Sequence, residues 1–338
     1  MSERKKDEAV RVKKWGLALW ITLLGGGVGH LYSAPAWSQV YPSRPIRLIV
    51  PFPPGGATDT IARTFGAALG ELLGRPILID NKGGAGGTLG VTEAARAPAD
   101  GYTILISEPG GMSIGPNFQK GLAFDPLRDF ASIGQVVSVP MLLVSHPSLP
   151  ARSLAELLAA SKMSRAPLNY GSPGNGTMQH LVGEQLRQAT GLNLVHIPYK
   201  GGAPAMNDLL GGQIALMMVT APTVAAHVRA GKLIGLAMLT RERDSALPNV
   251  PTVAEAGFKG FEDGIWQGFF APAGTPRDIV DRLNTDIRRA AATPEVRDRL
   301  QGIGARIVTG SPEALTQILR SDLARWAQVL KASGITNE

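Results

Sequence analysis

Short apolar runs alternate with amphipathic helical patterns along most of this chain, and this alternation constrains the fold more than any other feature. The pattern fills two blocks, residues 46–107 and 168–239. A strand followed by a helix and then by another strand is typical of parallel sheets that are covered by helices. The sequence therefore predicts an α/β fold with two such blocks.

The expected elements are short and closely spaced, in keeping with 41 glycines and 25 prolines. The expected strands are 46–51, 77–80, 102–107, 168–171, 194–198, 214–219, 233–239 and 266–271. The expected helices are 58–73, 88–96, 177–190, 203–210, 222–230, 276–292, 294–302 and 312–333. Pro276, Pro294 and Pro312 each follow Ser or Thr, which indicates an N-cap followed by proline at the first helical position.

Residues 131–150 lie between the two blocks and have an apolar centre at 136–144. We interpret this stretch as a candidate strand between two domains. A length of 338 residues also suggests two domains, each large enough to bury a core. With 44% hydrophobic and 18% charged residues, the chain is unlike a disordered protein.

The N-terminal residues have the pattern of a secretory signal. Residues 1–14 hold six basic and three acidic side chains, and no charged residue follows until after position 38. The apolar run 15–24 is followed by glycines and by a small-residue region that ends at Ser38 and Gln39. This run is too short to span a bilayer, which takes about 20 apolar residues. We predict a signal peptide at 1–38, with cleavage after Ser38 or alternatively after Ala36, and a soluble, exported mature protein.

The signal accounts for +3 of the formal charge of +7. The remaining basic residues are scattered and usually stand beside acidic ones, without a basic stripe or interleaved aromatics. A nucleic-acid partner is therefore not expected.

Three glycine-rich loops follow expected strands and lead into expected helices: 51–59, 81–88 and 170–177. Ligands of open α/β sheets bind at the carboxyl ends of strands. Glycine lets backbone N–H groups approach a ligand, and a helix N-terminus favours negative charge. These loops could bind a carboxylate or a phosphate, and the alternative interpretation is that they only make tight turns.

The sequence matches the common cofactor-binding and catalytic motifs only in part. The second loop has Leu89 where a dinucleotide fingerprint needs its last glycine, and Gly231-Lys232 is followed by leucine rather than Ser or Thr. Residues 111–115 match G-x-S-x-G, but the preceding strand ends at Ser107 and Pro116 follows, so a nucleophile elbow is not expected. Without cysteine or closely spaced histidines, no metal site, cofactor or catalytic group is predicted.

Other polar residues near these loops have ordinary structural explanations. His180 lies four residues into the helix after the third loop, where packing is the usual role and a ligand contact the alternative. Asp59 could serve the helix dipole, the ligand, or both. Trp266 is more typical of a core than of a ligand wall.

A series of motifs resembles the Bug-type (TctC-like) periplasmic solute-binding receptors of tripartite tricarboxylate transporters. The motifs are 41–47 (YPSRPIR), 50–56 (VPFPPGG) with Asp59, 81–87 (NKGGAGG), 98–102 (PADGY), 124–126 (FDP), 169–172 (NYGS), 176–177 (GT) with His180 and Leu181, 196–201 (HIPYKG) and 271–276 (APAGTP). The resemblance extends over 41–338, and the order of many separate motifs makes it specific.

The resemblance implies a type II periplasmic-binding-protein fold, in which two α/β lobes are joined by two crossover strands around a ligand cleft. We expect a discontinuous first lobe, 39–142 plus 241–338, and a second lobe, 143–240. The crossings are expected near 140–145 and 239–243. In such receptors the first two loops hold a carboxylate through backbone N–H groups and bridging waters.

The resemblance also implies a set of ligand-binding residues. By matching position these are Gly55, Gly56, Asp59, Gly84, Ala85 and Gly86 in one lobe, and Ser172, Gly176, Thr177, His180 and Tyr199 in the other. Neighbouring positions add Phe52, Ser107, Thr220 and Trp266 as candidates.

Two departures from the family pattern bear on the ligand. Val219 and Thr220 stand where an Asp-Asn pair often reaches the cleft, which suggests a less polar distal end, such as an aromatic or aliphatic acid. Gly111 and Gly115 stand where Thr and Asn are frequent, with Glu108 nearby.

The predicted function is an extracytoplasmic receptor that captures a small carboxylate for a tripartite tricarboxylate-type uptake system. Its expected partners are that solute and the membrane permease subunits, and the expected state is a periplasmic monomer. One alternative is presentation of the ligand to a sensor kinase. Another is an enzyme such as a hydrolase on the same two-lobed fold, for which only His180 with Asp59 could form a titratable dyad.

Overall fold

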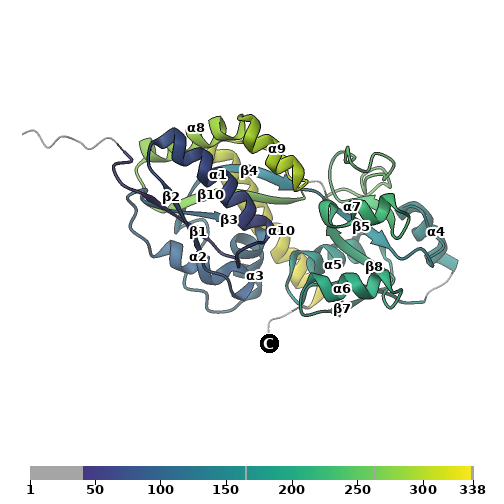
Figure 1. Ribbon diagram of the computed structural model, residues 1–338. Coiled ribbons are helices and arrows are strands. Elements are labelled where there is room, and N and C mark those ends of the chain that lie inside the picture. Colours follow the sequence, from purple (N-terminus) through teal and green to yellow (C-terminus); the bar gives the residue numbers. More distant parts are fainter. Residues whose placement is uncertain (1–40, 164–165, 262–263, 336–338) are drawn as a thin grey trace, which may run out of the picture. The chain divides into compact units, whose positions relative to one another are not determined.

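Two β-sheets with helices packed on their faces make up the part of the chain that this computed structural model describes, residues 41–163, 166–261 and 264–335 (Figure 1). Residues 41–338 form a single compact unit. The predicted signal peptide and its cleavage site lie outside the described residues. None of the described helices is long and apolar enough to cross a membrane.

The first sheet takes strands from both ends of the described chain. Its strands are β1 (Ile46–Val50), β2 (Ile77–Asn81), β3 (Thr103–Ser107), β4 (Phe130–Val139), β10 (Ile265–Pro272) and β11 (Arg306–Ile307). Their order is β11-β4-β10-β3-β1-β2. Strand β1 pairs parallel with β2 and β3, whereas β10 pairs antiparallel with β3 and β4.

The second sheet is built from the middle of the chain. Its strands are β5 (Met141–Ser145), β6 (Leu168–Ser172), β7 (Leu194–Pro198), β8 (Leu216–Thr220) and β9 (Ile234–Met238). Their order is β7-β6-β8-β5-β9, with β6 parallel to β7 and β8 and with β5 antiparallel to β8 and β9. Each sheet is therefore mixed. The parallel pairing that the strand–helix alternation predicts holds only inside the two blocks, because the strands that join the blocks run in the opposite direction.

Helices connect these strands and cover the sheets. They are α1 (Ala57–Leu73), α2 (Thr88–Ala95), α3 (Gly115–Phe118), α4 (Leu154–Met163), α5 (Met178–Thr190), α6 (Gly202–Leu210), α7 (Ala221–Arg229), α8 (Arg277–Ala291), α9 (Pro294–Gly302) and α10 (Pro312–Ser333), with a 3-10 turn η1 (Ala85–Gly87) and a π-helical turn η2 (Gly110–Ile114).

Both faces of the first sheet are buried, as the nearly continuous apolar composition of its central strands requires. Successive side chains of a strand point to opposite faces. Leu48 and Val50 of β1 accordingly join one core cluster, which includes residues of α1 and α8 such as Phe65 and Leu283. Ile49 joins a different cluster, which includes Val91 of α2 and Leu315 of α10. The sheet is thus held between two helical layers.

The chain passes from the first sheet to the second at Pro140. The apolar stretch 136–144 is not one strand, as the sequence suggests, but the end of β4 in one sheet and the whole of β5 in the other. Proline has no N–H group to donate to a ladder, so it breaks the strand. The chain returns in the segment 239–264 between β9 and β10.

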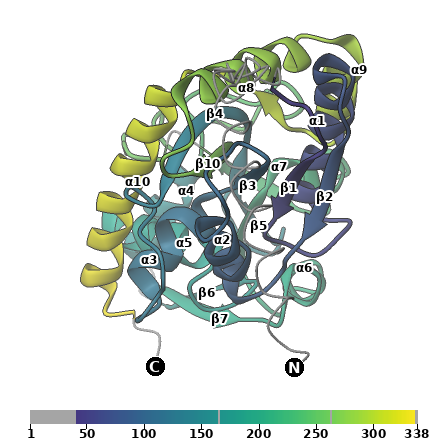
Figure 2. The same cartoon turned by 90° about the vertical axis from the view of Figure 1, so that its left-hand side faces the viewer.

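The C-terminal helix α10, yellow in Figures 1 and 2, contacts strand β4 of the first sheet and helix α5, which lies between β6 and β7 in the chain. Asn117 of α3 donates its side-chain N–H to the carbonyl of Leu323 on α10 at 2.9 Å. Gln188 of α5 donates to the carbonyl of Val329 at 3.3 Å. Beside the strand crossings, α10 therefore provides a further connection between the two halves of the fold.

Candidate functional site

The loops that follow β1, β2 and β3 pack against one another at the carboxyl end of the parallel strands. A Cβ atom built on Gly83 would lie 2.8 Å from Pro53, and one built on Gly90 would lie 2.8 Å from the Cα of Pro51. A Cβ on Gly87 would lie 3.3 Å from Phe52 and 3.6 Å from Gly111. Only glycine allows this approach, so the glycines bring the three loops into one cluster.

Asp59 on α1 holds the first loop in place. Its carboxylate is 3% exposed and accepts hydrogen bonds from Gly55 N, Arg63 Nε and Asn81 Nδ2, each at 2.9 Å. Burial alone would raise the pKa of Asp59, but these hydrogen bonds outweigh it and lower the pKa below its ordinary value. Because Asp59 is fully engaged with protein groups, we interpret it as a positioning residue of the first loop.

Asn81 is a residue that the sequence reasoning missed. It ends β2, and its Nδ2 donates both to Asp59 and to the carbonyl of Phe52, the latter at 3.0 Å. The first and second loops are therefore joined by one amide side chain. The sequence feature that points to Asn81 is its position at the carboxyl end of a strand, directly before the glycine-rich run.

The second loop has an unusual backbone. Gly84, Ala85, Gly86 and Gly87 all have positive φ, at 144°, 49°, 68° and 99°. Ala85 is the one non-glycine residue with positive φ among those described. Its carbonyl accepts hydrogen bonds from Thr88 Oγ1 at 2.9 Å and Gln119 Nε2 at 2.8 Å, which stabilise this conformation.

Helices α1 and α2 both begin at these loops without a side-chain cap. Their N-cap residues are Gly56 and Gly87, neither of which has a side chain to accept a hydrogen bond from the first turn. Unsatisfied N–H groups at a helix start carry partial positive charge and bind anions. The first two loops thus present backbone donors that the chain itself leaves uncapped.

The third glycine-rich loop, in the second sheet, differs from the first two. Helix α5 is capped by Thr177, whose side chain accepts from His180 N and donates to Gly174 O at 2.8 Å. Gly176 N donates to His180 Nδ1 at 3.1 Å. Ser172 Oγ donates to Gly174 O at 2.9 Å. These predicted site residues hold the loop in shape through bonds to one another.

Two histidines stack beneath this loop. The rings of His180 and His196 have centroids 3.7 Å apart and planes inclined by 9°, and His196 Nε2 lies 2.6 Å from Ser172 Oγ. Burial lowers the pKa of both rings, and the neighbouring His180 charge helps to lower that of His196 to about 4. We therefore expect both rings to be neutral at neutral pH.

The remaining predicted residues have separate places. Tyr199 donates its hydroxyl to Asp208 at 2.7 Å, and burial together with this carboxylate raises its pKa to about 12. Thr220 precedes α7, and its hydroxyl lies 2.8 Å from that of Thr223. Neither residue belongs to the cluster of the first two loops.

Two predicted ligand residues are enclosed by the first half of the fold. Trp266 is 1% exposed and donates its indole N–H to Asp322 at 2.6 Å, so the structure places it in the core rather than at the loops. Ser107 is fully buried at the end of β3, and its hydroxyl has no hydrogen-bond partner among the described residues.

Glu108, directly after β3, is half-buried, and its side chain makes no hydrogen bond or ion pair with the described residues. Burial raises its pKa to about 7. A Cβ built on Gly110 would lie 3.4 Å from Glu108 Oε1 and 3.2 Å from Gly86 O. The carboxyl group therefore lies beside the backbone of the second loop.

The arrangement does not resemble a catalytic centre. Ser113 of the G-x-S-x-G match is fully buried within η2 and donates to Pro109 O at 3.1 Å. Among the described residues no hydrogen bond joins Asp59 to His180, the one candidate dyad. Within the same residues, no group of three or more His, Asp or Glu side chains could hold a metal ion.

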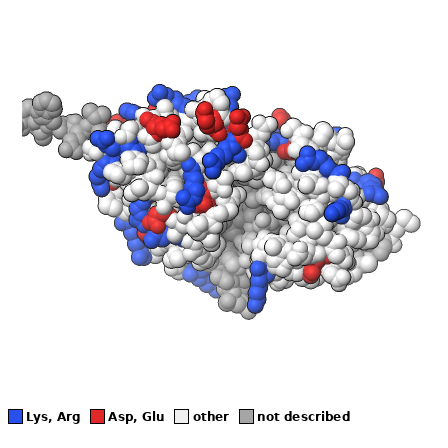
Figure 3. All heavy atoms as spheres, in the orientation of Figure 1, with Lys and Arg blue, Asp and Glu red and all other residues white. Residues whose placement is uncertain are grey.

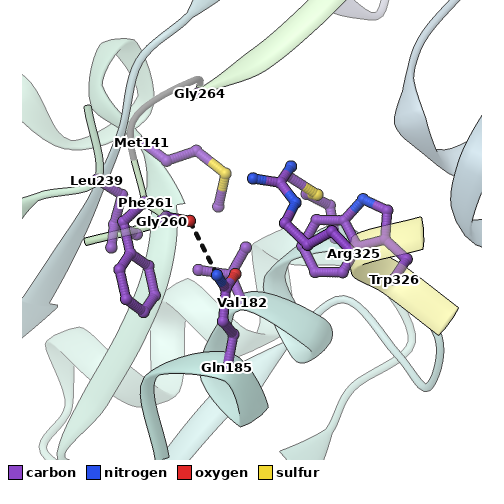
Figure 4. Close-up of a pocket in the computed structure, with 10 residues that line it drawn as sticks. Met141, Val182, Gln185, Leu239, Gly260, Phe261, Gly264, Arg325 and Trp326 are labelled. Atoms are coloured by element: carbon purple, nitrogen blue, oxygen red, sulfur yellow. Dashed lines mark hydrogen bonds between the residues drawn. The ribbon is translucent and has the colours of Figure 1, made fainter. Parts of the chain in front are cut away.

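A small apolar cavity lies elsewhere, between α5, α10 and the crossing segments (Figure 4). It is lined by residues such as Met141, Val182 and Trp326, and Gln185 donates to Gly260 O at its edge at 2.8 Å. Its volume of about 20 Å³ is near that of one water molecule. None of the predicted ligand residues lines it.

Charged side chains are interspersed on the face shown in Figure 3, where Lys and Arg alternate with Asp and Glu. Next to the second loop, Arg47 is ion-paired with both Asp80 and Glu93, and Lys82 lies 3.6 Å from Asp80. The cations closest in sequence to the second loop are thus paired with acidic groups. Any anion at the loops would rely on backbone donors.

Comparison with known proteins decides the family. Residues 61–335 match the family described as the tripartite tricarboxylate transporter family receptor, TctC. The chain belongs to this family. Protein BugT of Bordetella pertussis is 36% identical over 303 residues, which cover 89% of this chain and 93% of BugT. TctC-family receptors are periplasmic solute-binding proteins and not enzymes.

Solved structures of the TctC family confirm the predicted two-lobed fold. The periplasmic binding protein BugD is 39% identical with a TM-score of 0.72, covering 88% of this chain and 100% of BugD. R. palustris Rpa4515, solved with adipate, is 35% identical with a TM-score of 0.74 and covers 88% and 99%. MatC from Rhodopseudomonas palustris, solved with malate, is 34% identical with a TM-score of 0.71 and covers 86% and 100%.

Proposed function

We propose that this protein is a periplasmic receptor that captures a small carboxylate and delivers it to a tripartite tricarboxylate-type uptake system. The observation that carries this proposal is the convergence of two uncapped helix starts, at Gly56 and Gly87, on one cluster of glycine loops. Family members with adipate and malate support a carboxylate as the ligand.

In this proposal the ligand carboxylate binds to the backbone of the first and second loops. Gly55, Gly56, Gly84, Ala85 and Gly86 provide this backbone. The N–H groups and the partial positive charge of the two helix starts stabilise the anion. Phe52, half-buried beside Gly87, would form an apolar wall.

The second lobe closes over the bound solute in this proposal. Thr220 lies at an uncapped helix start and offers a hydroxyl. The loop around Ser172, Gly176 and Thr177, supported by His180 and Tyr199, keeps a fixed shape through its internal hydrogen bonds. A ligand that contacts both lobes binds the closed state more tightly and so shifts the population toward it.

The partners follow from the family rather than from the geometry. We infer that residues 1–38 export the chain and are cleaved, and that the mature protein acts as a monomer. The loaded receptor would then dock on membrane permease subunits of the transporter. The ligand's distal end would meet Thr220 instead of an acidic side chain, because Val219 is buried in the core of the second half, and this suits an aliphatic or aromatic acid.

A thermal-shift screen of the mature protein tests this function. We expect adipate, malate or an aromatic carboxylate to raise the unfolding temperature, because a ligand that binds only the folded state stabilises it by about 2.7 kcal/mol at 100 times its Kd. The matched control is the neutral diamide of the same acid, which should have no effect. The proposal would be contradicted if the diamide raised the unfolding temperature. It would also be contradicted if no carboxylate raised it.

A further inference from the structure

Glu108 lies beside the backbone of the second loop, and its surroundings are unusual for a carboxylate. It follows β3 and lies between Ser107, whose buried hydroxyl has no partner among the described residues, and the π-helical turn η2. Within the same part of the chain, the side chain of Glu108 forms neither an ion pair nor a hydrogen bond, whereas its backbone carbonyl accepts from Met112 N at 3.1 Å. A half-buried carboxyl group without a partner is costly in its ionised form.

The position of Glu108 relative to the second loop comes from Gly110. The point where a Cβ of Gly110 would stand is 3.4 Å from Glu108 Oε1 and 3.2 Å from Gly86 O. Both oxygens therefore border the same small space. The proposed function places the ligand carboxylate on the backbone of this loop, so two carboxyl groups would lie close together.

Among the described residues, no ion pair joins a cation to the Glu108 side chain. Among the elements that pack against η2, the strand β3 and the turns η1 and α3 carry no charged residue. Glu93 of α2 is paired with Arg47. The charged residues of α10 are Glu313, Arg320, Asp322, Arg325 and Lys331, and none of them bonds to Glu108. Burial is the one cause that raises the pKa of Glu108, to about 7.

A bound carboxylate would add a second negative charge beside Glu108. Two like charges at short distance disfavour double ionisation, so one of the two groups retains a proton. We propose that Glu108 links ligand capture to proton uptake: in the complex its neutral carboxyl group donates a hydrogen bond to the ligand carboxylate. The proton comes from solvent and binds a carboxylate oxygen of Glu108 as an O–H bond, and no other covalent bond forms or breaks. This inference rests on the proposed function.

The proposal also narrows the ligand class. A neutral Glu108 that donates a hydrogen bond suits a simple carboxylate, such as a dicarboxylic acid. An amino acid would instead bring an ammonium group, which favours an ionised glutamate. Malate and aspartate differ only in carrying a hydroxyl or an ammonium group, so this pair of compounds distinguishes the two cases.

Titration calorimetry of the mature protein with adipate and malate at pH 6.5, 7.5 and 8.5 tests the proton link. These diacids are ionised throughout this range, and the stacked histidines have lowered pKa values. For the wild-type protein we expect Kd to rise about 20-fold from pH 6.5 to 8.5, the change that a group with a pKa of about 7 produces. For Glu108→Gln, which keeps a donor but cannot ionise, Kd should be constant within about twofold.

Glu71→Gln is the matched control, because Glu71 is an exposed glutamate of the same half of the fold, on α1. It should show the wild-type pH dependence. A constant Kd for the wild-type protein, or the same pH dependence in Glu108→Gln, would overturn the proton link and leave the proposed function intact. Tighter binding of aspartate than of malate, lost in Glu108→Gln, would overturn it as well. Absence of binding by every carboxylate at every pH would refute the proposed function itself.

Discussion

Asp59 shows how one buried carboxylate can position a loop through its hydrogen bonds to protein groups. It joins three separate pieces of the site, because its donors come from the first loop, from α1 and from the end of β2. In such an arrangement the carboxylate is satisfied by protein groups, and its energetic role is to fix backbone geometry.

Asp59→Asn should destabilise the protein by about 1–3 kcal/mol, since it weakens charge-assisted hydrogen bonds in a buried place. Because its pKa is lowered in the folded state, the contribution of Asp59 is present above the unfolded pKa and is lost as pH falls through the folded pKa. Urea denaturation at pH 7 and pH 3 measures both effects. The control Asp281→Asn removes the exposed i,i+4 pair with Arg277 and should cost about 0.5 kcal/mol or less. Equal losses in both variants would contradict the positioning role.

Glu108 makes the stability of the fold depend on pH in the opposite direction from Asp59. Its folded pKa of about 7 lies above the ordinary value of 4.5, so the folded protein keeps a proton that the unfolded chain releases. Stability therefore falls as pH rises from about 4.5 to about 7. We expect Glu108→Gln to be more stable than the wild-type protein by about 1–3 kcal/mol at pH 8, and equal to it at pH 4.5. A difference that is the same at both pH values, in urea denaturation, would exclude the raised pKa.

The residue types at the site were predictable, but their partners were not. Glycine runs after strands indicate close backbone approach, and the structure shows that approach at Gly83 and Gly87. In contrast, the engagement of Asp59 by Asn81 depends on the parallel register of β1 and β2, which places Asn81 opposite Val50. Sequence periodicity does not specify such a cross-strand contact, and the same limit applies to the stack of His180 on His196.

At the scale of elements, helix starts distinguish the first two glycine-rich loops from the third. Helices α1 and α2 begin at glycine and lack a side-chain cap, whereas Thr177 caps α5. Where a side chain caps a helix, it accepts a hydrogen bond from one of the unpaired N–H groups of the first turn. Such a helix start is a weaker anion site. We therefore assign the carboxylate to the first two loops and a shaping role to the third.

Removal of matching caps in two helices tests this assignment. Thr177→Ala and Thr293→Ala each remove a threonine cap, from α5 and α9, and each should destabilise the protein by about 1 kcal/mol. Only Thr177→Ala should also weaken carboxylate binding, because only Thr177 supports the third loop through Gly174. Denaturation and calorimetry on both variants provide the comparison. Equal affinity in the two variants would show that the third loop does not contribute to binding.

The proline signals for helix starts were correct in two of three cases. Pro294 and Pro312 occupy first-turn positions after the caps Thr293 and Ser311. Pro276 instead precedes α8 as its N-cap residue, and the hydroxyl of Thr275 donates to Pro272 O without capping the helix.

Some elements escaped the sequence reasoning. Helix α4 has a detectable signal, since Ser153 accepts from Glu156 N at 3.2 Å in the spacing of a capping box. The turns η2 and α3 cover a segment rich in glycine and proline, which is typical of loops rather than helices. Tertiary packing against α10 stabilises them instead.

At the scale of the whole molecule, the sequence predicts two α/β blocks but not how the chain connects them. The break at Pro140 divides one apolar stretch between two sheets, and β10 returns antiparallel between β3 and β4. This connection makes the first half discontinuous in sequence. Non-local pairings of this kind carry no local signal, so they emerge only from the structure or from resemblance to a family.

Two contacts between the halves of the fold are close at a glycine. A Cβ on Gly176 would lie 2.4 Å from Phe118, and one on Gly304 would lie 2.3 Å from Pro222. Phe118 ends α3 and Gly304 follows α9 in the first half, whereas Gly176 precedes α5 and Pro222 lies in α7 of the second half. Small residues at these points permit close contact between the two halves.

The central claim is that backbone groups of the first loop hold the ligand carboxylate, and Gly56→Val tests it most directly. A Cβ on Gly56 meets only Pro53 O at 3.8 Å and the residue has φ −77°, so the fold can accept a side chain there. Gly302→Val, with nothing within 4 Å, is the matched control. In calorimetry with the carboxylate that most stabilises the wild-type protein, we expect Gly56→Val to lose at least about 100-fold in affinity, about 2.7 kcal/mol, while both variants remain folded. Wild-type affinity in a folded Gly56→Val variant would contradict the placement of the site.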